Sequence, residues 1–376
     1  MSAFKMPTSE DELARLSRGL NFYIKRLLVQ IALAEGLPDL LNDYRSVFDL
    51  TSLSNIKDLK LLRELILSLS RLNIIDQKGD MFKWVGGEIR ISKEEEDLKW
   101  LAEPWVILLK LYSKRFSRLL RGETPITLKE TGIWDSLYSC HLYQKIWREA
   151  IDSLNIDDSS IILDVGCKTG WSAINILENY DPKNIISIDN NDGFLSVADE
   201  NISNFIPDRR FKVSLVKHDF VKEIDFSGYL GDAKPDKVIV SYLFHWYDEG
   251  DYLNILGNIR RIVADHAKIV FIQPHIAYRN QSRFFELPLY SDERFRGYPL
   301  LESLANALVS SGFSIPERKF NIYITCNADD APTKQLRISA DIPKFCKYCG
   351  NPLQENAFFC AYCKSVVDFN VNLPLF

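Results

Sequence analysis

The pattern of apolar and polar positions changes along the 376-residue chain, and it divides the chain into parts. Over residues 1–92, apolar residues recur at helical spacing, as in LNFYIKRLLVQIALAEGLPDLL, a helix that should stop near Gly36. Two further amphipathic helices are predicted in LSNIKDLKLLRELILSLSRLNII, and NIIDQKGDMFKWV predicts two short strands around Gly79. Three helices and a two-stranded wing form a winged-helix pattern, which suits either packing and dimerisation or DNA binding.

Beyond this part, residues 93–155 again have helical spacing and are rich in Trp and Tyr, most of them expected in the core. From Ile161 the short β-branched runs IILDV, IISID, FKVSLVK, KVIVSYLF and AKIVFIQ alternate with helical stretches. This alternation predicts an α/β fold with a parallel sheet covered on both faces. GFSIPERKFNIYITC adds two strands, expected as an antiparallel hairpin at the sheet edge.

Composition and charge narrow the function classes. A net charge of −5 argues against wholesale coating of nucleic acid. The apolar runs are too short for a membrane span, and the N-terminal residues lack the apolar core of a signal peptide. These features predict a cytoplasmic protein that does not engage a membrane.

The segment IILDVGCKTGWSAINIL, residues 161–177, is a buried strand, a glycine turn and a helix. A phosphate-binding Walker loop ends in Gly-Lys-Ser/Thr, but here the residue immediately before Lys168 is Cys167 and not glycine. A dinucleotide fingerprint needs a glycine where Lys168 stands. What remains is Asp164-x-Gly166-x-x-x-Gly170, whose small residues let the turn pass close to a ligand that lacks phosphate.

This turn resembles motif I of the class I methyltransferases that use S-adenosyl-L-methionine (SAM). The resemblance implies that Asp164, Gly166 and Gly170 bind the methionyl part of SAM. Two later strands agree with it: Asp189 ends the second strand and would accept hydrogen bonds from the ribose hydroxyls. Asp219 and Phe220 follow the third strand and would meet the adenine amino group and cover the ring. Each acid alone also suits a solvated loop, but together they lie where open α/β sheets bind ligands.

The segment SYLFHWYDEGDYLNILGNIRRIVADHAKIVFIQP resembles the fourth-strand region of small-molecule O-methyltransferases that dimerise through a winged-helix domain. That family implies a homodimer and a small-molecule acceptor. Its catalytic histidine falls on Phe244 when the chains are matched at Trp246, and His245 is one residue later. His245 is the candidate general base; the alternative is a residue that packs beside the cofactor.

Four cysteines form two pairs in FCKYCGNPLQENAFFCAYCKS near the C-terminal end. This spacing resembles a zinc ribbon, in which four thiolates bind a structural Zn²⁺ tetrahedrally; the predicted ligands are Cys346, Cys349, Cys360 and Cys363. A redox pair of dithiols is the alternative. Ribbons of this kind commonly hold proteins or nucleic acids.

The combined prediction is a Rossmann-like class I methyltransferase sheet with a winged-helix-like N-terminal domain and a small zinc ribbon. The predicted boundaries are 1–92 (winged-helix-like), 93–155 (helical connector), 156–330 (SAM-binding domain), 331–342 (linker) and 343–368 (zinc ribbon). The first functional hypothesis is transfer of a methyl group from SAM to oxygen or nitrogen of a small molecule. The alternatives are modification of RNA or protein docked by the ribbon, and a winged-helix regulator whose SAM domain senses its ligand or is inactive.

Overall fold

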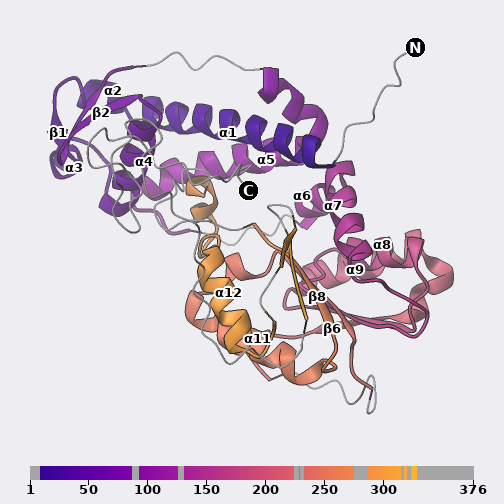
Figure 1. Ribbon diagram of the computed structural model, residues 1–376. Helices are drawn as coiled ribbons and strands as arrows, with labels where there is room; N and C mark the ends of the chain where they lie inside the picture. Colours follow the sequence, from indigo (N-terminus) through magenta and orange to yellow (C-terminus); the bar gives the residue numbers. More distant parts are fainter. Residues whose placement is uncertain are drawn as a thin grey trace, which may run out of the picture.

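The computed structural model describes residues 9–86, 93–125, 131–223, 228, 233–274, 286–314, 317–319 and 323–327. The four paired cysteines, and with them the predicted linker and zinc ribbon, lie outside these residues. Figure 1 shows the two described parts: a helical N-terminal part and an α/β part built on a sheet.

The α/β part contains a seven-stranded sheet that confirms the predicted fold class. The strand order is β6 (Val213–Lys217), β5 (Asn184–Asp189), β4 (Ile161–Val165), β7 (Lys237–Ser241), β8 (Lys268–Ile272), β10 (Tyr323–Asn327) and β9 (Glu317–Lys319). The first five strands run parallel, and β10 pairs antiparallel with both β8 and β9. The predicted hairpin is therefore present, with β9 at the edge.

The apolar residues of the central strands alternate between two separate cores. One core takes Ile162, Ile239, Val270 and Ile272, and the other takes Leu163, Val238, Val240, Ile269 and Phe271. Side chains on a strand alternate between faces, so an apolar run of this kind needs cover on both sides. Helices α7 (His141–Asp152), α8 (Trp171–Asn179) and α9 (Asp192–Phe205) belong to the first core, while α11 (Tyr252–Ile262) and α12 (Leu301–Ser310) belong to the second (Figure 1).

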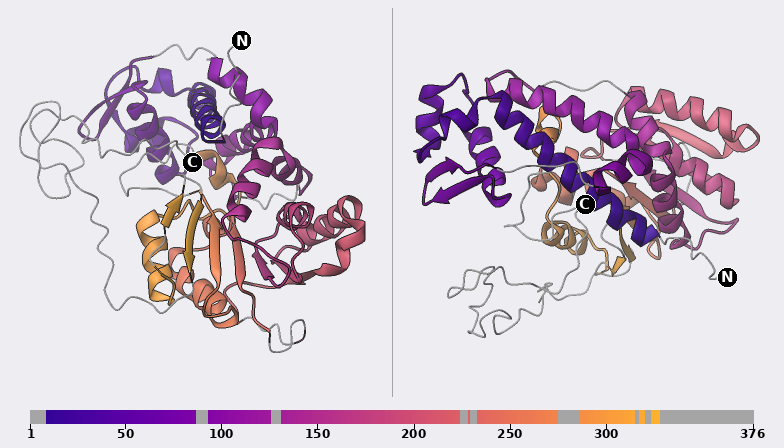
Figure 2. Two further views of the ribbon diagram at one scale, coloured as in Figure 1. Left: turned by 45° about the vertical axis from the view of Figure 1, so that its right-hand side comes forward. Right: turned by 90° about the horizontal axis from the view of Figure 1, so that it is seen from above.

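The N-terminal part is built on two long helices, α1 (Ser9–Ala34) and α5 (Lys93–Leu120), which lie side by side (Figure 2). The short helices α2 (Leu37–Leu40), α3 (Val47–Leu53) and α4 (Leu59–Arg71) follow α1. Strands β2 (Ile75–Lys78) and β3 (Met81–Trp84) form the predicted hairpin, and β1 (Arg45–Ser46) pairs with β3. The predicted helices and the hairpin at Gly79 are therefore present in this part.

Two contacts position the N-terminal part against the sheet. Helix α5 packs against the short helix η4 (Leu287–Ser291), and the Ser291 hydroxyl donates a hydrogen bond to the carbonyl of Tyr112 at 3.0 Å. Helix α6 (Thr131–Ser139) packs between α5 and α9. It brings Trp134 and Tyr138 close to the carboxyl ends of the parallel strands. None of the described helices is long and apolar enough to cross a membrane.

Candidate active site

The turn after β4 lies at the carboxyl ends of the parallel strands and is anchored to the next strand. The amides of Gly166 and Cys167 both donate to the carbonyl of Ile188 on β5, at 2.9 and 3.0 Å. Gly166, Lys168 and Gly170 have positive φ values of 76°, 51° and 84°. Lysine rarely takes such a conformation, which costs an L-residue about 1–2 kcal/mol.

The two glycines are required by close contacts as well as by their backbone conformation. A Cβ on Gly166 would lie 2.6 Å from the carbonyl oxygen of Ser241 at the end of β7. A Cβ on Gly170 would lie 3.1 Å from the Cβ of Ala198 on α9. The predicted role of these glycines, a turn that passes close to its neighbours, therefore has a geometric basis.

Asp189 ends β5, and its carboxylate is held by two backbone amides. Oδ2 accepts from the amide of Lys168 at 3.1 Å, and Oδ1 accepts from the amide of Asn191 at 3.0 Å. The Lys168 ammonium lies 3.6 Å from Oδ2, and both side chains are largely buried. Lys168 thus points at the predicted ribose-binding acid rather than to solvent.

Asp164 occupies a different position from the one expected for a direct ligand of SAM. Its side chain is fully buried, it accepts hydrogen bonds from the hydroxyls of Ser172 and Ser187, and it does not line the pocket beside Asp189. Burial raises the pKa of Asp164 to about 7, against the effect of the two hydroxyls, which lower it. This carboxyl braces the start of α8 against β5 from behind the turn.

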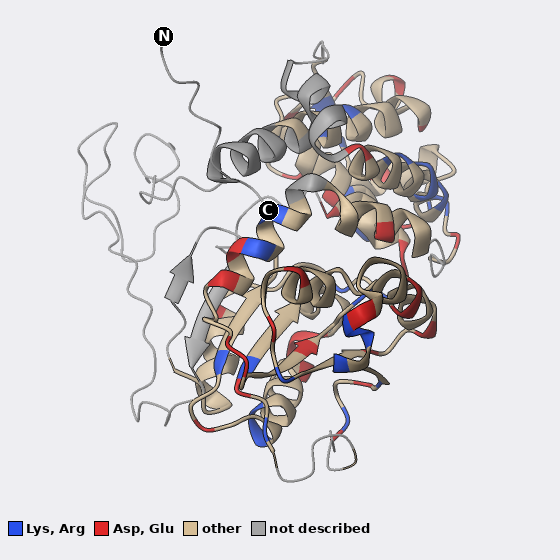
Figure 3. Cartoon of the chain, turned by 90° about the vertical axis from the view of Figure 1, so that its right-hand side faces the viewer, with Lys and Arg blue, Asp and Glu red and all other residues tan. Residues whose placement is uncertain are grey.

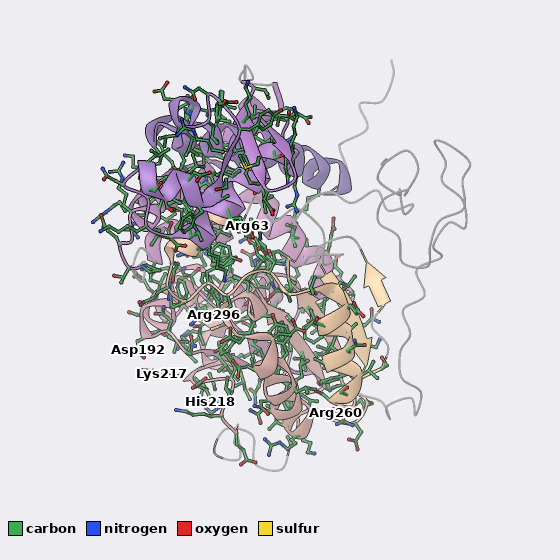
Figure 4. The ribbon with its side chains drawn as sticks, turned by 90° about the vertical axis from the view of Figure 1, so that its left-hand side faces the viewer. Arg63, Asp192, Lys217, His218, Arg260 and Arg296 are labelled. Carbon is green, nitrogen blue, oxygen red and sulfur yellow. The ribbon has the colours of Figure 1, made fainter. Side chains whose placement is uncertain are left out.

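Asp219 and Phe220 follow β6, as the sequence predicts, and meet the pocket through Tyr247. Phe220 is buried, and its ring lies edge-on to the ring of Tyr247 with centroids 6.4 Å apart. Burial raises the pKa of Tyr247, and the charges of Asp219 and Asp189 raise it further. At the end of β6, Lys217 forms an ion pair with Asp192 at 2.5 Å, beside His218 (Figure 4).

A solvent-connected pocket of about 620 Å³ opens above Asp189. The Asn190 amide donates to the Tyr247 hydroxyl at 3.0 Å on one wall, and Arg294 stacks over Trp246 on another, with the guanidinium carbon 5.3 Å from the ring centroid. The lining residues are Trp134, Tyr138, Lys168, Asp189, Asn190, Asn191, Phe194, Leu243, Trp246, Tyr247 and Arg294.

A second, narrow pocket adjoins the first, and most of its lining residues are aromatic. The two pockets share Trp134, Tyr138 and Trp246. The remaining lining residues of this aromatic pocket are Trp105, Leu137, Tyr143, Tyr242, His245, Pro274, Leu289, Phe295 and Tyr298. A polar ligand above Asp189 and a flat apolar molecule would therefore meet at the shared wall.

The structure distinguishes the two candidates for the family's catalytic histidine. Phe244 is fully buried and packs on Tyr252 and Phe271, with ring centroids 5.0 and 6.1 Å apart, on the far side of the sheet end. His245 lines the aromatic pocket, and its Nδ1 lies 3.1 Å from Nε2 of Gln273. Burial, together with the charge of Lys168, holds the pKa of His245 well below its usual value of 6.5.

The residues around the first pocket fit SAM. The turn from Gly166 to Gly170 is tight at Gly166, where a Cβ would contact the carbonyl oxygen of Ser241. Beside this turn, the Asp189 carboxylate is fixed by its hydrogen bonds. That carboxylate has about four lone-pair positions, so the bonds from two amides and Lys168 leave room for a hydroxyl donor. Asp189 would hold the ribose, and the turn from Gly166 to Gly170 would pass the methionyl part.

Of the three strand-end acids that the sequence singles out, only Asp189 lines the first pocket, and several other lining residues gave no signal in the sequence. Asn190, Asn191, Phe194, Tyr247 and Arg294 come from three separate segments, and no periodicity links them. The aromatic segment before residue 155 did give a signal, since Trp105, Trp134, Tyr138 and Tyr143 now line the aromatic pocket. Within the described part of the chain, no group of His, Cys, Asp or Glu is arranged to hold a metal ion.

Comparison with known proteins agrees with this site. Residues 162–266 match a family model described as a methyltransferase domain. The uncharacterized protein MJ0906 of Methanocaldococcus jannaschii is 26% identical over 188 residues, 49% of this chain and 48% of that protein. The chain thus aligns with about half the length of this curated relative.

Among solved structures, the carbon methyltransferase DszA has a similar fold, with a TM-score of 0.60 and 16% identity. The similarity covers 85% of this chain and 91% of DszA. An O-methyltransferase family protein from Burkholderia thailandensis gives a TM-score of 0.48 at 13% identity, over 82% of this chain and 94% of that one. Residues 162–266 therefore form a methyltransferase domain, and the chain as a whole has the same overall fold as DszA.

Proposed function

We propose that this protein transfers the methyl group of SAM to a small, flat acceptor. The observation that carries the proposal is the pair of adjoining pockets at the carboxyl ends of the strands. One pocket holds a fixed carboxylate, Asp189, and the other is aromatic; they share Trp134, Tyr138 and Trp246. When bound, SAM would supply an electrophilic methyl group on its sulfonium.

The aromatic pocket would hold and orient the acceptor. Its aromatic lining residues suit a planar molecule, because aromatic pairs favour offset-stacked or edge-on contacts. Methyl transfer gains much of its rate from holding the nucleophile in line, so rigid walls serve the chemistry directly. Trp105 and Tyr143 fix each other through a 3.1 Å hydrogen bond. Water would be largely excluded from such a pocket.

A small acceptor agrees with the distribution of charge. In the view of Figure 3, Lys and Arg positions are interspersed with Asp and Glu positions along the described parts of the chain. A nucleic acid acceptor would favour a continuous positive track. The macromolecular alternative is supported instead by the predicted zinc ribbon, which could dock such an acceptor.

The test is calorimetric titration with SAM and S-adenosylhomocysteine. Asp189→Asn should bind both roughly 10- to 100-fold more weakly, since hydrogen bonds to a charged group contribute about 1.5–3 kcal/mol. Asp192→Asn is the matched control, because Asp192 is exposed and pairs with Lys217 outside the pocket. Absence of SAM binding by the folded wild-type protein, or equal binding by the two variants, would refute the proposed function.

Dimerisation through the N-terminal part belongs to the same proposal. Large apolar side chains are exposed on this part, and they include Phe22, Leu33, Phe48, Leu53 and Ile107. A second copy of the chain would cover such a surface. Light scattering after size-exclusion chromatography should give twice the chain mass; a monomer at assay concentration would contradict this.

For the C-terminal cysteines we propose a structural zinc site formed by Cys346, Cys349, Cys360 and Cys363. The support is their spacing, which places two close pairs of thiolates ten residues apart. A site closed by four sulfurs has no open position for water, so the metal would stabilise the ribbon rather than take part in methyl transfer. Contact of the ribbon with a protein or nucleic acid is the second candidate role.

A further inference from the structure

Gln273 follows β8 at the carboxyl end of the sheet, and its side-chain amide has a defined orientation. Oε1 accepts from the backbone amide of Phe244 at 3.0 Å, and Nε2 donates to the carbonyl of Pro274 at 2.8 Å. With the two atoms exchanged, an NH₂ group would face an N–H and an oxygen would face a carbonyl. The neighbouring backbone groups therefore fix Nε2 as the donor.

The fixed amide determines which nitrogen of His245 carries the proton. Nε2 of Gln273 lies 3.1 Å from Nδ1 of His245, so Nδ1 must accept and cannot carry a hydrogen. In a neutral imidazole the hydrogen is then on Nε2. Among the described residues Nε2 has no hydrogen-bond partner, and the His245 side chain lines the aromatic pocket.

The described residues around His245 keep the imidazole ring neutral, and most of them are aromatic. His245 packs between Trp246, Phe295 and Tyr298, with ring centroids 4.6, 6.0 and 5.5 Å away. The nearby cations are Lys168, whose charge lowers the pKa of His245, and Arg294 over Trp246.

The tyrosines of the pocket, Tyr138, Tyr143, Tyr242 and Tyr298, have pKa values raised by burial. No carboxylate is among the described residues that line this pocket.

We propose that His245 is a hydrogen-bond donor to the acceptor, held in that state by Gln273, and that the pocket takes aromatic oxyanions. The acceptor class is an acidic phenol or enol that enters already ionised. This inference rests on the proposed methyltransferase function and assigns its acceptor. His245 is the catalytic residue that touches the reacting oxygen, and Gln273 is a positioning residue.

The chemistry balances without a protein base. The phenol or enol loses its proton to water before binding. In the pocket, an oxyanion lone pair forms the new C–O bond while the C–S bond of SAM breaks and its electron pair stays on sulfur. The products are a neutral ether and S-adenosylhomocysteine. The Nε2–H bond offsets the cost of burying the anion, as donors in an oxyanion site do.

The primary test is the tautomer of His245, measured on the full chain labelled with ¹⁵N-histidine. Two-dimensional NMR should show a protonated Nε2 and an unprotonated Nδ1, without any ligand bound. His245→Gln identifies the signal by its loss, and substitution of the other four histidines assigns it by elimination if that variant does not fold. A proton on Nδ1 would overturn the proposal whatever the activity, whereas the proposed function is tested separately by SAM binding.

The second test uses SAM with substituted phenols of graded acidity. For each phenol the pH midpoint of kcat/KM should follow the phenol's own pKa. His245→Phe should raise the KM of the phenolate roughly 10- to 100-fold, because it removes a hydrogen bond to the buried anion, while His245→Gln, which keeps a donor, should raise it less. A single midpoint common to all phenols would reveal a protein base and overturn the proposal, as would methylation of amines in preference to phenols.

Discussion

The backbone contact at Gly166 predicts a large effect from a single methyl group. In Gly166→Ala, the new Cβ would lie 2.6 Å from the carbonyl oxygen of Ser241, a distance that real Cβ contacts do not show. The clashing atom is backbone at the end of β7, so no rotamer change relieves it. The residue also has a φ of 76°, which disfavours any L-residue with a Cβ.

The size of the effect follows from these two contributions. The left-handed conformation costs about 1–2 kcal/mol, and overpacking a rigid contact costs about 1–3 kcal/mol. Gly166→Ala should therefore lower the free energy of unfolding by about 2–5 kcal/mol. If β4 moves away from β7 to relieve the clash with Ser241, the turn that approaches SAM moves with it. The affinity for SAM should therefore fall as well.

Urea denaturation of the two variants measures this directly, with Gly257→Ala as the matched control. Gly257 lies within α11, and a Cβ there meets no atom within 4 Å. That variant should be more stable by about 0.5–1 kcal/mol, because alanine favours the helix. The same glycine-to-alanine change should thus lower the free energy of unfolding at position 166 and raise it at position 257. A loss below about 1 kcal/mol for Gly166→Ala at an unchanged m-value would refute the reasoning.

Three further predictions concern charge, a loop anchor and the metal. Asp164 is a carboxyl whose native pKa is raised, so the native state binds the proton more tightly and the free energy of unfolding should fall as pH rises from about 4 to 7. A shift from 3.8 to about 7 corresponds to about 4 kcal/mol. Asp164→Asn should remove this slope in pH-dependent denaturation, and an unchanged slope would contradict the assignment.

The Asn258 amide donates to the carbonyls of Phe220, Val221 and Lys222 at 3.1, 3.1 and 2.7 Å. Asn258→Ala should cost about 1–3 kcal/mol and weaken SAM binding; equal SAM affinity would show that this loop does not hold the cofactor. Metal analysis should find about one zinc per chain, lost in a Cys346→Ser and Cys360→Ser double variant that still binds SAM.

Local sequence patterns determined much of the fold. The short β-branched runs need cover on both faces, and the strand and helix positions of the sheet follow from that requirement. Gly166, Gly170 and Asp189 could be found because a turn after a buried strand limits which residues fit. The hairpin at β9 and β10 followed from two strand runs joined without a helix.

Tertiary structure decided the chemistry of the site. Asp164 and Asp189 both lie at strand ends, yet one is buried behind the turn and the other faces the pocket. Phe244 and His245 differ by one position, and only the path of the chain after β7 shows which one reaches the aromatic pocket. The proton position on His245 depends on Gln273, 28 residues away along the chain. Hydrogen bonds between distant segments carry no periodicity in the sequence, so they become visible only when the segments meet in the folded protein.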